Sequence, residues 1–236
     1  MTNTSKSASV NRLFGSIATK YDLANHVLSL GIDNLWRKKS VRLTRPAKED
    51  RLLDMCSGTG DFAMAFAKSE NGPGEITCCD FSGEMLAGAE VKFAKLNAKS
   101  NVSFSVQDCT ATDLAESSFD IISCGFGVRN MADLDKGLGE MKRLLKPGGK
   151  VCILEFTLPK NPIIRFGYLA YFRFVLPLIG GMLTGDIGAY RYLVSSVREW
   201  DKDVDLPKRL EAAGFKMKSA EPVSLGIACI YTAHRA

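Results

Sequence analysis

Apolar and polar positions follow two rhythms along the central part of the chain. Short apolar runs of strand length alternate with longer stretches in which apolar residues recur every three or four positions. The pattern predicts strands at 51–56, 74–80, 101–108, 119–126 and 150–156, and helices at 61–68, 82–96 and 134–145. Strands that alternate with helices pair in parallel through right-handed crossovers, so we expect an α/β fold around a parallel sheet.

The beginning of the chain has a helical pattern. Six apolar residues lie near helical spacing between residues 8 and 29: Val10, Leu13, Phe14, Ile17, Tyr21 and Leu28. LSLGI (28–32) interrupts this pattern, NLWRKKSVRL (34–43) resumes it, and Pro46 closes it. The chain therefore divides into a helical N-terminal segment, 1–46, and a main domain, 47–236.

The last third of the chain adds two strands to the expected sheet. A helix is predicted over 205–215, with Gly214 at its end, and two runs at 217–223 and 226–235 predict a final strand pair. The expected fold is a three-layer, Rossmann-like α/β domain. Its mostly parallel seven-stranded sheet has an antiparallel C-terminal strand.

Composition argues against several classes of protein. The 236 residues carry a net charge of +5 without a dense run of lysine and arginine, so we expect no nucleic-acid partner. Seven cysteines without a CxxC pair and only two histidines argue against a metal site and a disulfide framework. Cys78 and Cys79 lie in an apolar run and are typical of core thiols in a reduced cytoplasmic protein. The longest uncharged apolar run, 174–185, is 12 residues long, whereas a membrane span needs roughly 20, so none is expected.

The stretch LLDMCSGTGD (52–61) holds the first candidate site. Gly58 to Ala63 fit the pattern G-x-G-x-x-A between a predicted strand and a predicted helix, which is typical of a nucleotide-binding turn. The alternative is a tight strand-to-helix turn without a ligand. Asp80 ends the next predicted strand, where a carboxylate accepts both ribose hydroxyls of an adenosine. Asp108 ends the strand after that, where it can accept from an adenine amino group.

Charge separates the candidate ligands of this turn. Asp54 precedes the turn and Asp61 follows it, whereas a pyrophosphate prefers a helix N-terminus without carboxylates. The two carboxylates favour a sulfonium or an ammonium group, and therefore S-adenosylmethionine over NAD. No Gly-Lys-Ser/Thr follows the turn, which excludes a P-loop.

Several stretches together resemble class I S-adenosylmethionine-dependent methyltransferases: LLDMCSGTGD, CCDFSGEML, FSVQD, CGFGVRN and LLKPGGKVCILEF. More narrowly, the chain is similar to the ubiquinone/menaquinone biosynthesis C-methyltransferase family. The stretches that carry this narrower resemblance are FGSIATKYDLANHVLSLGIDNLWRK (14–38), GFGVRN (125–130) and VLPLIGGMLTGDIGAYRYLVSSVREW (175–200). The resemblance covers nearly the whole chain.

The resemblance implies S-adenosylmethionine as the cofactor. It assigns the cofactor contacts to seven residues: Gly58, Thr59, Gly60, Asp80, Asp108, Cys109 and Gly125. In this assignment the glycine turn with Thr59 lines the methionine end, and Asp80 holds the ribose. Asp108 and Cys109 contact the adenine, and Gly125 opens the strand below the methyl-transfer site.

The resemblance also implies methylation of a ring carbon on a prenylated quinol, either demethylmenaquinol or 2-methoxy-6-polyprenyl-1,4-benzoquinol. Arg129 and Asn130 are the catalytic candidates. Arg129 would stabilise a developing quinolate or position a water that acts as a base, and Asn130 would hold that water or a quinol oxygen. The alternative for Arg129 is a structural ion pair with a helix aspartate such as Asp133.

A second polar cluster lies in the N-terminal segment. Tyr21 and Asn25 form one pair at i,i+4, and Asp22 and His26 form another. His26 is a candidate base, although a histidine in such a position is more often packed or capped.

A prenylated acceptor resides in the membrane, and the region 160–200 fits a role beside it. Aromatic residues alternate there with Arg165 and Arg173, which is typical of an interfacial segment. The alternative is a partly buried helix that packs on the sheet. We expect a cytoplasmic protein that associates peripherally with the inner face of the membrane, and a homodimer is compatible with the sequence.

Three other functions stay open at this point. They are methylation of another small apolar acceptor such as a sterol or phospholipid, an NAD-dependent dehydrogenase, and a binding protein with a relict cofactor site. The stretches 14–38 and GFGVRN argue against the first, and the acidic residues at three strand ends argue against the last. Titration with S-adenosylhomocysteine and NADH separates methyl transfer from dehydrogenation.

Overall fold

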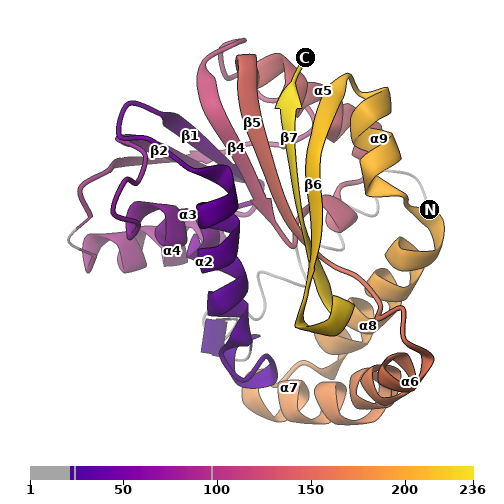
Figure 1. Ribbon diagram of the computed structural model, residues 1–236. Coiled ribbons are helices and arrows are strands. Elements are labelled where there is room, and N and C mark those ends of the chain that lie inside the picture. Colours follow the sequence, from indigo (N-terminus) through magenta and orange to yellow (C-terminus); the bar gives the residue numbers. More distant parts are fainter. Residues whose placement is uncertain (1–21, 24, 97) are drawn as a thin grey trace.

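The sheet forms the centre of the molecule (Figure 1). The computed structural model describes residues 22, 23, 25–96 and 98–236. Seven strands lie in the order β3-β2-β1-β4-β5-β7-β6, and β7 runs antiparallel to both of its neighbours. The strands are β1 (Arg51–Met55), β2 (Glu75–Asp80), β3 (Asn101–Val106), β4 (Phe119–Gly125), β5 (Leu145–Phe156), β6 (Phe215–Val223) and β7 (Ala228–Arg235). The predicted fold class, including the antiparallel C-terminal strand, is confirmed.

Helices cover both faces of the sheet and make three layers. On one face lie α2 (Ile32–Thr44), α3 (Asp61–Ala67) and α4 (Gly83–Ala94), and on the other lie α5 (Leu134–Leu144) and α9 (Leu206–Ala212). Trp36 of α2 and Phe66 of α3 belong to the first core, and Leu138 of α5 and Leu210 of α9 belong to the second. Both cores form because the central strands are buried on both faces, as their continuous apolar runs require.

The predicted strand and helix ends agree with the structure to within a few residues, with one difference in β5. The predicted turn KPGG (146–149) lies inside this strand as an irregularity: Phe119 pairs with Leu145, but Ile121 pairs with Lys150. The extra residues are accommodated because Gly148 adopts a left-handed conformation, with a φ of 74°.

The N-terminal segment turns sharply before α2. Residues 25–28 are helical, and Leu30 and Gly31 then have positive φ values of 52° and 74°. The predicted break at LSLGI therefore falls at this turn. The predicted apolar positions from Val10 to Tyr21, and the pair Tyr21–Asn25, lie outside the described residues.

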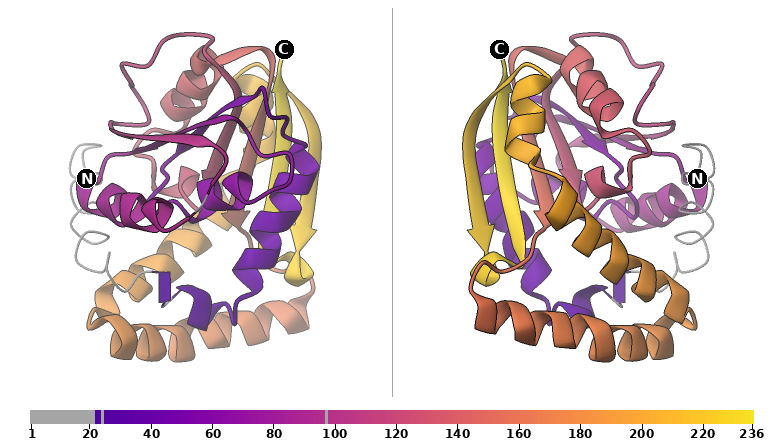
Figure 2. Two further views of the ribbon diagram at one scale, coloured as in Figure 1. Left: turned by 90° about the vertical axis from the view of Figure 1, so that its left-hand side faces the viewer. Right: turned by 90° about the vertical axis from the view of Figure 1, so that its right-hand side faces the viewer.

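A nearly continuous helical rod crosses beyond the carboxyl ends of the strands (Figures 1 and 2). It consists of α6 (Pro162–Ala170), a π-helical turn η2 (Tyr171–Val175) and α7 (Leu176–Thr184), and α8 (Ile187–Asp203) leads back to the sheet. The rod packs against α8 through a small core of its own that includes Tyr168, Phe172 and Tyr190.

The rod is longer than the 12-residue uncharged run from which no membrane span was expected. Pro162–Thr184 is a helix of 23 residues that is long and apolar enough, by length and composition alone, to cross a membrane. The helix is longer than the uncharged run because it includes Arg165 and Arg173.

Candidate active site

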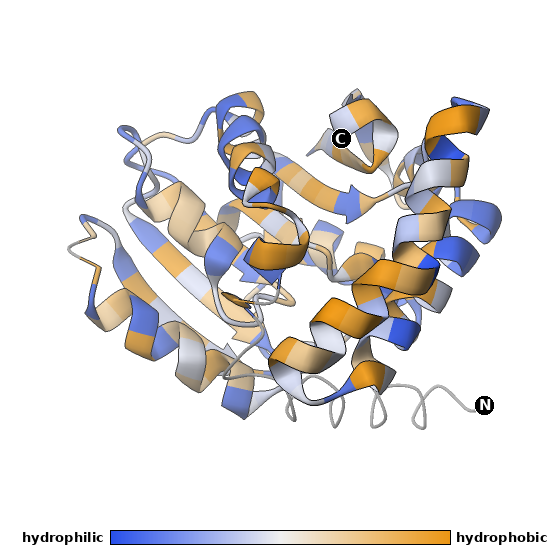
Figure 3. Ribbon diagram, turned by 90° about the horizontal axis from the view of Figure 1, so that it is seen from below, coloured by the Kyte–Doolittle hydropathy of each residue, from blue (hydrophilic) through white to orange (hydrophobic). Residues whose placement is uncertain are grey.

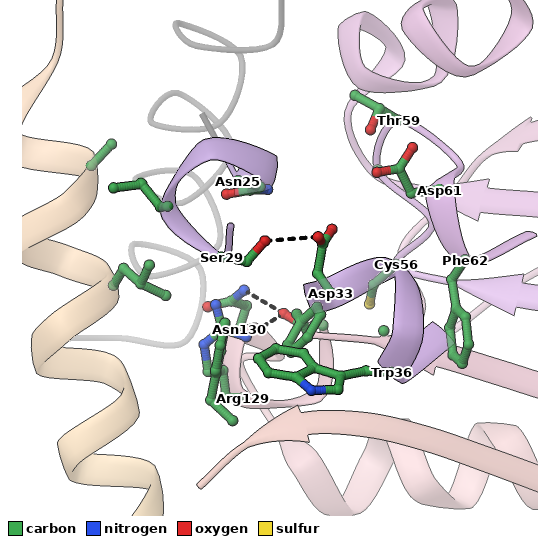
Figure 4. A pocket seen from close by; sticks show the side chains of 18 of the residues that line it. Asn25, Ser29, Asp33, Trp36, Cys56, Thr59, Asp61, Phe62, Arg129 and Asn130 are labelled. Atoms are coloured by element: carbon green, nitrogen blue, oxygen red, sulfur yellow. Dashed lines mark hydrogen bonds between the residues drawn. The ribbon is translucent and has the colours of Figure 1, made fainter. Parts of the chain in front are cut away.

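A cavity of about 760 Å³ lies where the carboxyl ends of β1, β2 and β4 meet the rod and the N-terminal segment. Eight of the nine predicted site residues line it: Gly58, Thr59, Asp80, Asp108, Cys109, Gly125, Arg129 and Asn130. Figure 4 shows Arg129 and Asn130 on one side of the cavity, and Thr59 and Asp61 on another. The ninth residue, Gly60, is not among the lining residues.

The two glycines of the turn have different physical roles. Both adopt left-handed conformations, with φ values of 55° for Gly58 and 79° for Gly60. A Cβ on Gly60 would lie 3.0 Å from the Cβ of Ala89 and 3.1 Å from Cε2 of Phe93, so Gly60 lets α3 and α4 pack closely. Gly58 faces the cavity, and its N–H donates to the Asp80 carboxylate at 2.8 Å.

Two buried carboxylates stand at the ends of β1 and β2. Burial raises the pKa of Asp80 to about 6, although the N–H groups of Ser82 and Gly58 donate to it. Burial likewise raises the pKa of Asp54 to about 6, against the hydroxyls of Ser123 and Ser57. Both carboxylates line the cavity, where a cationic or hydrogen-bonding ligand would compensate for their desolvation.

Asp108 and Cys109 follow β3 rather than end it, because the strand stops at Val106. Asp108 is exposed, and one carboxylate oxygen accepts from the backbone and the hydroxyl of Thr110, both at 2.8 Å. The Cys109 thiol is buried and accepts from the N–H of Cys56 at 3.2 Å. Cys78 and Cys79 are buried as predicted.

Arg129 forms a buried ion pair with Glu155, not with Asp133. The guanidinium Nη1 lies 2.7 Å from Oε1 of Glu155 and donates to the carbonyl of Phe126 at 2.5 Å. Asp133 instead caps the N-terminus of α5 by accepting from the N–H of Lys136. Glu155 is completely buried, and burial raises its pKa in spite of the charge of Arg129.

Two buried polar atoms of the cavity wall are unsatisfied by the described part of the chain. Nε of Arg129 and the hydroxyl of Tyr168 have no hydrogen-bond partner among the described residues. Such atoms are rare in folded proteins and commonly mark a ligand position. Arg129 and Tyr168 therefore each keep an unused polar atom just beneath the surface of the cavity wall.

Asn130 is held from two sides. Its amide Nδ2 donates to the carbonyl of Phe126 at 3.3 Å, and its Oδ1 accepts from the hydroxyl of Tyr192 at 3.0 Å. Tyr192 comes from α8 and also lines the cavity. The short helix η1 (Val128–Asn130) thus presents Arg129 and Asn130 side by side.

Aromatic rings wall the part of the cavity around Arg129. Phe126 and Phe156 stack with centroids 4.4 Å apart, and Trp36 and Phe172 approach them edge-on or tilted. The guanidinium of Arg129 lies 5.3 Å from the ring of Phe156. Phe126 has a φ of 58°, a conformation that side chains rarely adopt and that is concentrated at functional sites. These rings suit a flat aromatic ligand.

A network of charges connects the N-terminal segment to α3 and α4. Lys92 lies 2.6 Å from the carboxylate of Asp22 and 2.5 Å from that of Asp61, and the Thr59 hydroxyl donates to Asp22 at 2.5 Å. His26 contacts Asp33 at 2.8 Å and Asp61 at 3.6 Å. Asp22 and His26 form no ion pair with each other, but both join the network around Asp61: His26 directly, and Asp22 through Lys92.

His26, Asp33 and Asp61 also have ligand atoms close enough together to hold a metal ion. Cations already neutralise the two carboxylates, however. Arg37 contacts both of them, and Lys92 contacts Asp61. The group is better described as an ion-pair network that holds the N-terminal segment over the cavity. The same pairing means that Asp61 is not the free carboxylate assumed for the glycine turn.

Glu155, Tyr168 and Tyr192 were not among the site residues predicted from the sequence, although Tyr168 belongs to the aromatic segment expected at the membrane. A carboxylate near the end of the apolar strand KVCILEF was the one available signal for Glu155, because a buried charge requires a partner. Tyr168 and Tyr192 had no local signal, since tertiary packing alone brings them to the cavity.

The residues present fit S-adenosylmethionine. The donor set combines the ionisable, buried Asp80 with a glycine turn in which Gly58 leaves the backbone approachable. The buried carboxylate of Asp54 at the same turn suits a cationic ligand. A sheet of this order, with such a site at its carboxyl edge, defines a class I S-adenosylmethionine-dependent methyltransferase.

Comparison with known proteins agrees with this class. A model of the ubiE/COQ5 methyltransferase family matches residues 1–235, and the chain belongs to this family. The chain is 39% identical over 232 residues to the ubiquinone/menaquinone biosynthesis C-methyltransferase UbiE of Geotalea daltonii, with 98% of each chain covered. It is 36% identical over 228 residues to the demethylmenaquinone methyltransferase of Bacteroides fragilis, covering 97% of this chain and 93% of the relative.

Solved structures share the fold at much lower identity. A SAM-dependent methyltransferase from Aquifex aeolicus matches with a TM-score of 0.57 and 17% identity, over 85% of this chain and 89% of that chain. Family membership disfavours both the dehydrogenase and a methyltransferase for a sterol or phospholipid.

Proposed function

We propose that the protein transfers a methyl group from S-adenosylmethionine to a ring carbon of demethylmenaquinol, of 2-methoxy-6-polyprenyl-1,4-benzoquinol, or of both. The observation that carries the proposal is the aromatic end of the cavity, where the buried Nε of Arg129 has no partner in the described part of the chain and lies beside stacked rings. The names of the two relatives above point to the same acceptors.

The cofactor side is assigned to the residues of the glycine turn and the strand ends. S-adenosylmethionine supplies an electrophilic methyl group when it is bound. Asp80 would accept the ribose hydroxyls, Gly58 and Thr59 would line the methionine end, and Asp108 with Cys109 would border the adenine. Gly60 would act on the site indirectly, through the packing of α3 against α4.

Arg129 would stabilise negative charge on the quinol oxygen as the hydroxyl loses its proton. A guanidinium stays protonated, so it acts as an electrostatic partner and not as the base itself. Glu155 would hold the guanidinium in place through Nη1, while Nε has no hydrogen-bond partner among the described residues. Asn130, oriented by Tyr192, would hold the second polar position, either a quinol oxygen or a water.

The N-terminal segment, 1–46, would serve as the substrate entrance, with residues 160–200 facing it. Val27, Leu30, Ile164 and Ile179 line the cavity from these two regions and provide an apolar path for a prenyl tail. Peripheral contact with the inner face of the membrane, from the cytoplasm, would let the tail enter without crossing water. A homodimer remains a prediction that sedimentation velocity tests.

Quinone profiling of cells that lack the protein tests the proposal. The expected result is accumulation of the unmethylated precursor, whose ring identifies the acceptor, with recovery by the wild-type chain and not by Asp80→Ala. An unchanged quinone profile would exclude the proposed substrates. Titration of the purified protein should in parallel show binding of S-adenosylhomocysteine and not of NADH.

A further inference from the structure

Three arginines share a second, shallow pocket between the rod and α8. This pocket has a volume of about 330 Å³ and is lined by Phe172, Arg173, Pro177, Arg191, Val194, Ser195 and Arg198. Phe172 lines both this pocket and the large cavity, so the two adjoin at this residue. The proposed function uses none of the three arginines.

None of these three guanidinium groups forms an ion pair with any residue that the structure describes. The neighbouring Arg165, by contrast, lies 3.3 Å from the carboxylate of Asp201. Arg191 and Arg198 stand seven residues apart on α8, with Ser195 between them on the same face. Arg173 comes from η2, where its guanidinium lies 5.6 Å from the Phe174 ring.

Three uncompensated positive charges around one depression favour an anion. A guanidinium offers five N–H donors in a planar fork that matches the oxygens of a phosphate group. The hydroxyl of Ser195, on the same wall, already donates to the carbonyl of Tyr192 at 3.0 Å, so the arginines are the donors that an anion would meet here. Three other lining residues, Phe172, Pro177 and Val194, are apolar. The pocket therefore suits an anionic group that is attached to an apolar group.

The surface next to this pocket identifies the kind of anion. The same rod exposes Phe166, Phe174, Leu178 and Met182, with exposed fractions between 62% and 86%. Figure 3 shows the rod as a largely hydrophobic band on the underside of the molecule. Exposed apolar side chains beside free arginines are typical of a helix that lies in the interface of an anionic bilayer.

We propose that Arg173, Arg191 and Arg198 form a binding site for the phosphate group of an anionic phospholipid. The proposal rests on the membrane contact in the proposed function and goes beyond it by naming the headgroup site. With a headgroup in this pocket, the exposed apolar side chains of the rod lie among the acyl chains. The large cavity, which adjoins the pocket at Phe172, then faces the bilayer. The prenylated acceptor then reaches the cavity directly from the membrane.

Co-sedimentation tests this site with vesicles of phosphatidylcholine alone and of phosphatidylcholine with phosphatidylglycerol. The variant is Arg191→Gln/Arg198→Gln. Its matched control is Arg42→Gln/Arg45→Gln, which removes the same charge from the C-terminal end of α2. This end lies away from the rod, because the carbonyl of Arg45 accepts from Lys150, near the amino ends of the parallel strands. Each basic group near an anionic leaflet is worth a factor of roughly five in binding. The variant should therefore bind anionic vesicles roughly 30-fold more weakly, with little change for the control.

The Arg191→Lys/Arg198→Lys variant separates a phosphate site from diffuse attraction. Lysine keeps the charge but loses the planar fork, so partial recovery supports a built site and full recovery overturns it. Equal losses in the variant and the control, or equal binding of the wild type to both vesicle types, also overturn the proposal. If inorganic phosphate raised the Tm of the protein, but the protein bound both vesicle types equally, the pocket would be assigned to a free anion and the lipid assignment would be overturned. Loss of a dimer in the glutamine variant, with unchanged vesicle binding, would assign the face to a second copy of the chain.

Turnover of a short-tailed, water-soluble demethylnaphthoquinol without vesicles keeps this proposal separate from the proposed function. Arg191→Gln/Arg198→Gln and its control Arg42→Gln/Arg45→Gln should keep the wild-type kcat and KM in that assay, because none of these four residues lines the cavity. Absence of turnover in the wild type would count against the proposed function. Normal turnover together with unchanged vesicle binding in the variant would count against the headgroup site alone.

Discussion

Replacement of Arg129 with alanine leaves the Glu155 carboxylate buried without its counter-charge. Arg129 and Glu155 are 7% and 0% exposed, and their charged atoms are 2.7 Å apart. Two donors would remain to Glu155: the N–H of Phe156 at 2.9 Å and that of residue 129 itself at 3.3 Å. Removal of one partner from a buried pair costs about 3–5 kcal/mol, so we expect a loss of this size in the free energy of unfolding. For a chain of this length, that corresponds to a fall in Tm of roughly 6–20 °C.

The pH dependence identifies the unpaired carboxylate as the cause. Burial already raises the pKa of Glu155 in the wild type, and removal of the guanidinium raises it further. An acid whose pKa is raised in the folded state costs stability above its unfolded pKa of about 4.3, and the cost disappears as the pH falls. The deficit of Arg129→Ala should therefore be largest at neutral pH and shrink toward pH 5. Glu155→Gln in the same background should recover much of it.

Chemical unfolding followed by circular dichroism at several pH values measures this deficit. Arg51→Ala is the matched control, because Arg51 and Glu75 also lie 2.7 Å apart but are exposed, and such pairs contribute at most about 1 kcal/mol. A deficit for Arg129→Ala below that of the control, or one independent of pH, would refute the reasoning. The same measurement shows under which conditions Arg129→Ala is folded. Turnover of this variant must be assayed under those conditions, because otherwise unfolding would also abolish activity. Arg129→Lys, which keeps a charge beside Glu155, is the better catalytic test.

Three further outcomes follow from the site. Affinity for S-adenosylhomocysteine should fall by up to tenfold per pH unit below about pH 6, because Asp80 must be ionised, and calorimetry should show a shallower slope for Asp80→Asn. Gly60→Ala should lower the free energy of unfolding by about 1–3 kcal/mol, because alanine is strained at a φ of 79° and its Cβ crowds that of Ala89. Lys92→Met should speed hydrogen exchange in residues 25–33, because Lys92 joins Asp22 to α3.

Each outcome has its own control. A constant affinity between pH 5 and 8 would contradict the role given to Asp80. Ala89→Gly should recover only the steric part of the Gly60→Ala loss, and full recovery would mean that the backbone is unstrained. Lys95→Met, at the C-cap of the same helix and without an ion pair to any described residue, should leave exchange unchanged. An equal effect of the two lysine variants would contradict the role given to the charge network.

The sheet and the cofactor side were predictable because they depend on local patterns. Parallel strands gather their carboxyl ends at one edge, so acidic residues that follow successive strands had to meet there, and Asp54 and Asp80 do so. Ser82 caps α4 as its position before the helix suggests, with its hydroxyl accepting from the N–H of Met85.

The acceptor side was only partly predictable, because distant contacts decide it. Asp133 was the nearest carboxylate in sequence to Arg129, but Glu155, on the neighbouring strand, lies nearer in space. Asp22 and His26 lie at helical spacing, but the partners of both are on other elements. Local spacing describes an isolated helix, whereas a buried charge pairs with whatever the fold places beside it.

The most direct measurement of the central claim is methyl transfer by the purified protein. The enzyme is incubated with S-adenosylmethionine carrying a deuterated methyl group and with reduced demethylmenaquinone, and the product is analysed by mass spectrometry and NMR. The account predicts one deuterated methyl group on the quinol ring carbon and none with Asp80→Ala. A label on a quinol oxygen, or no transfer by a folded protein that binds S-adenosylhomocysteine, would contradict it.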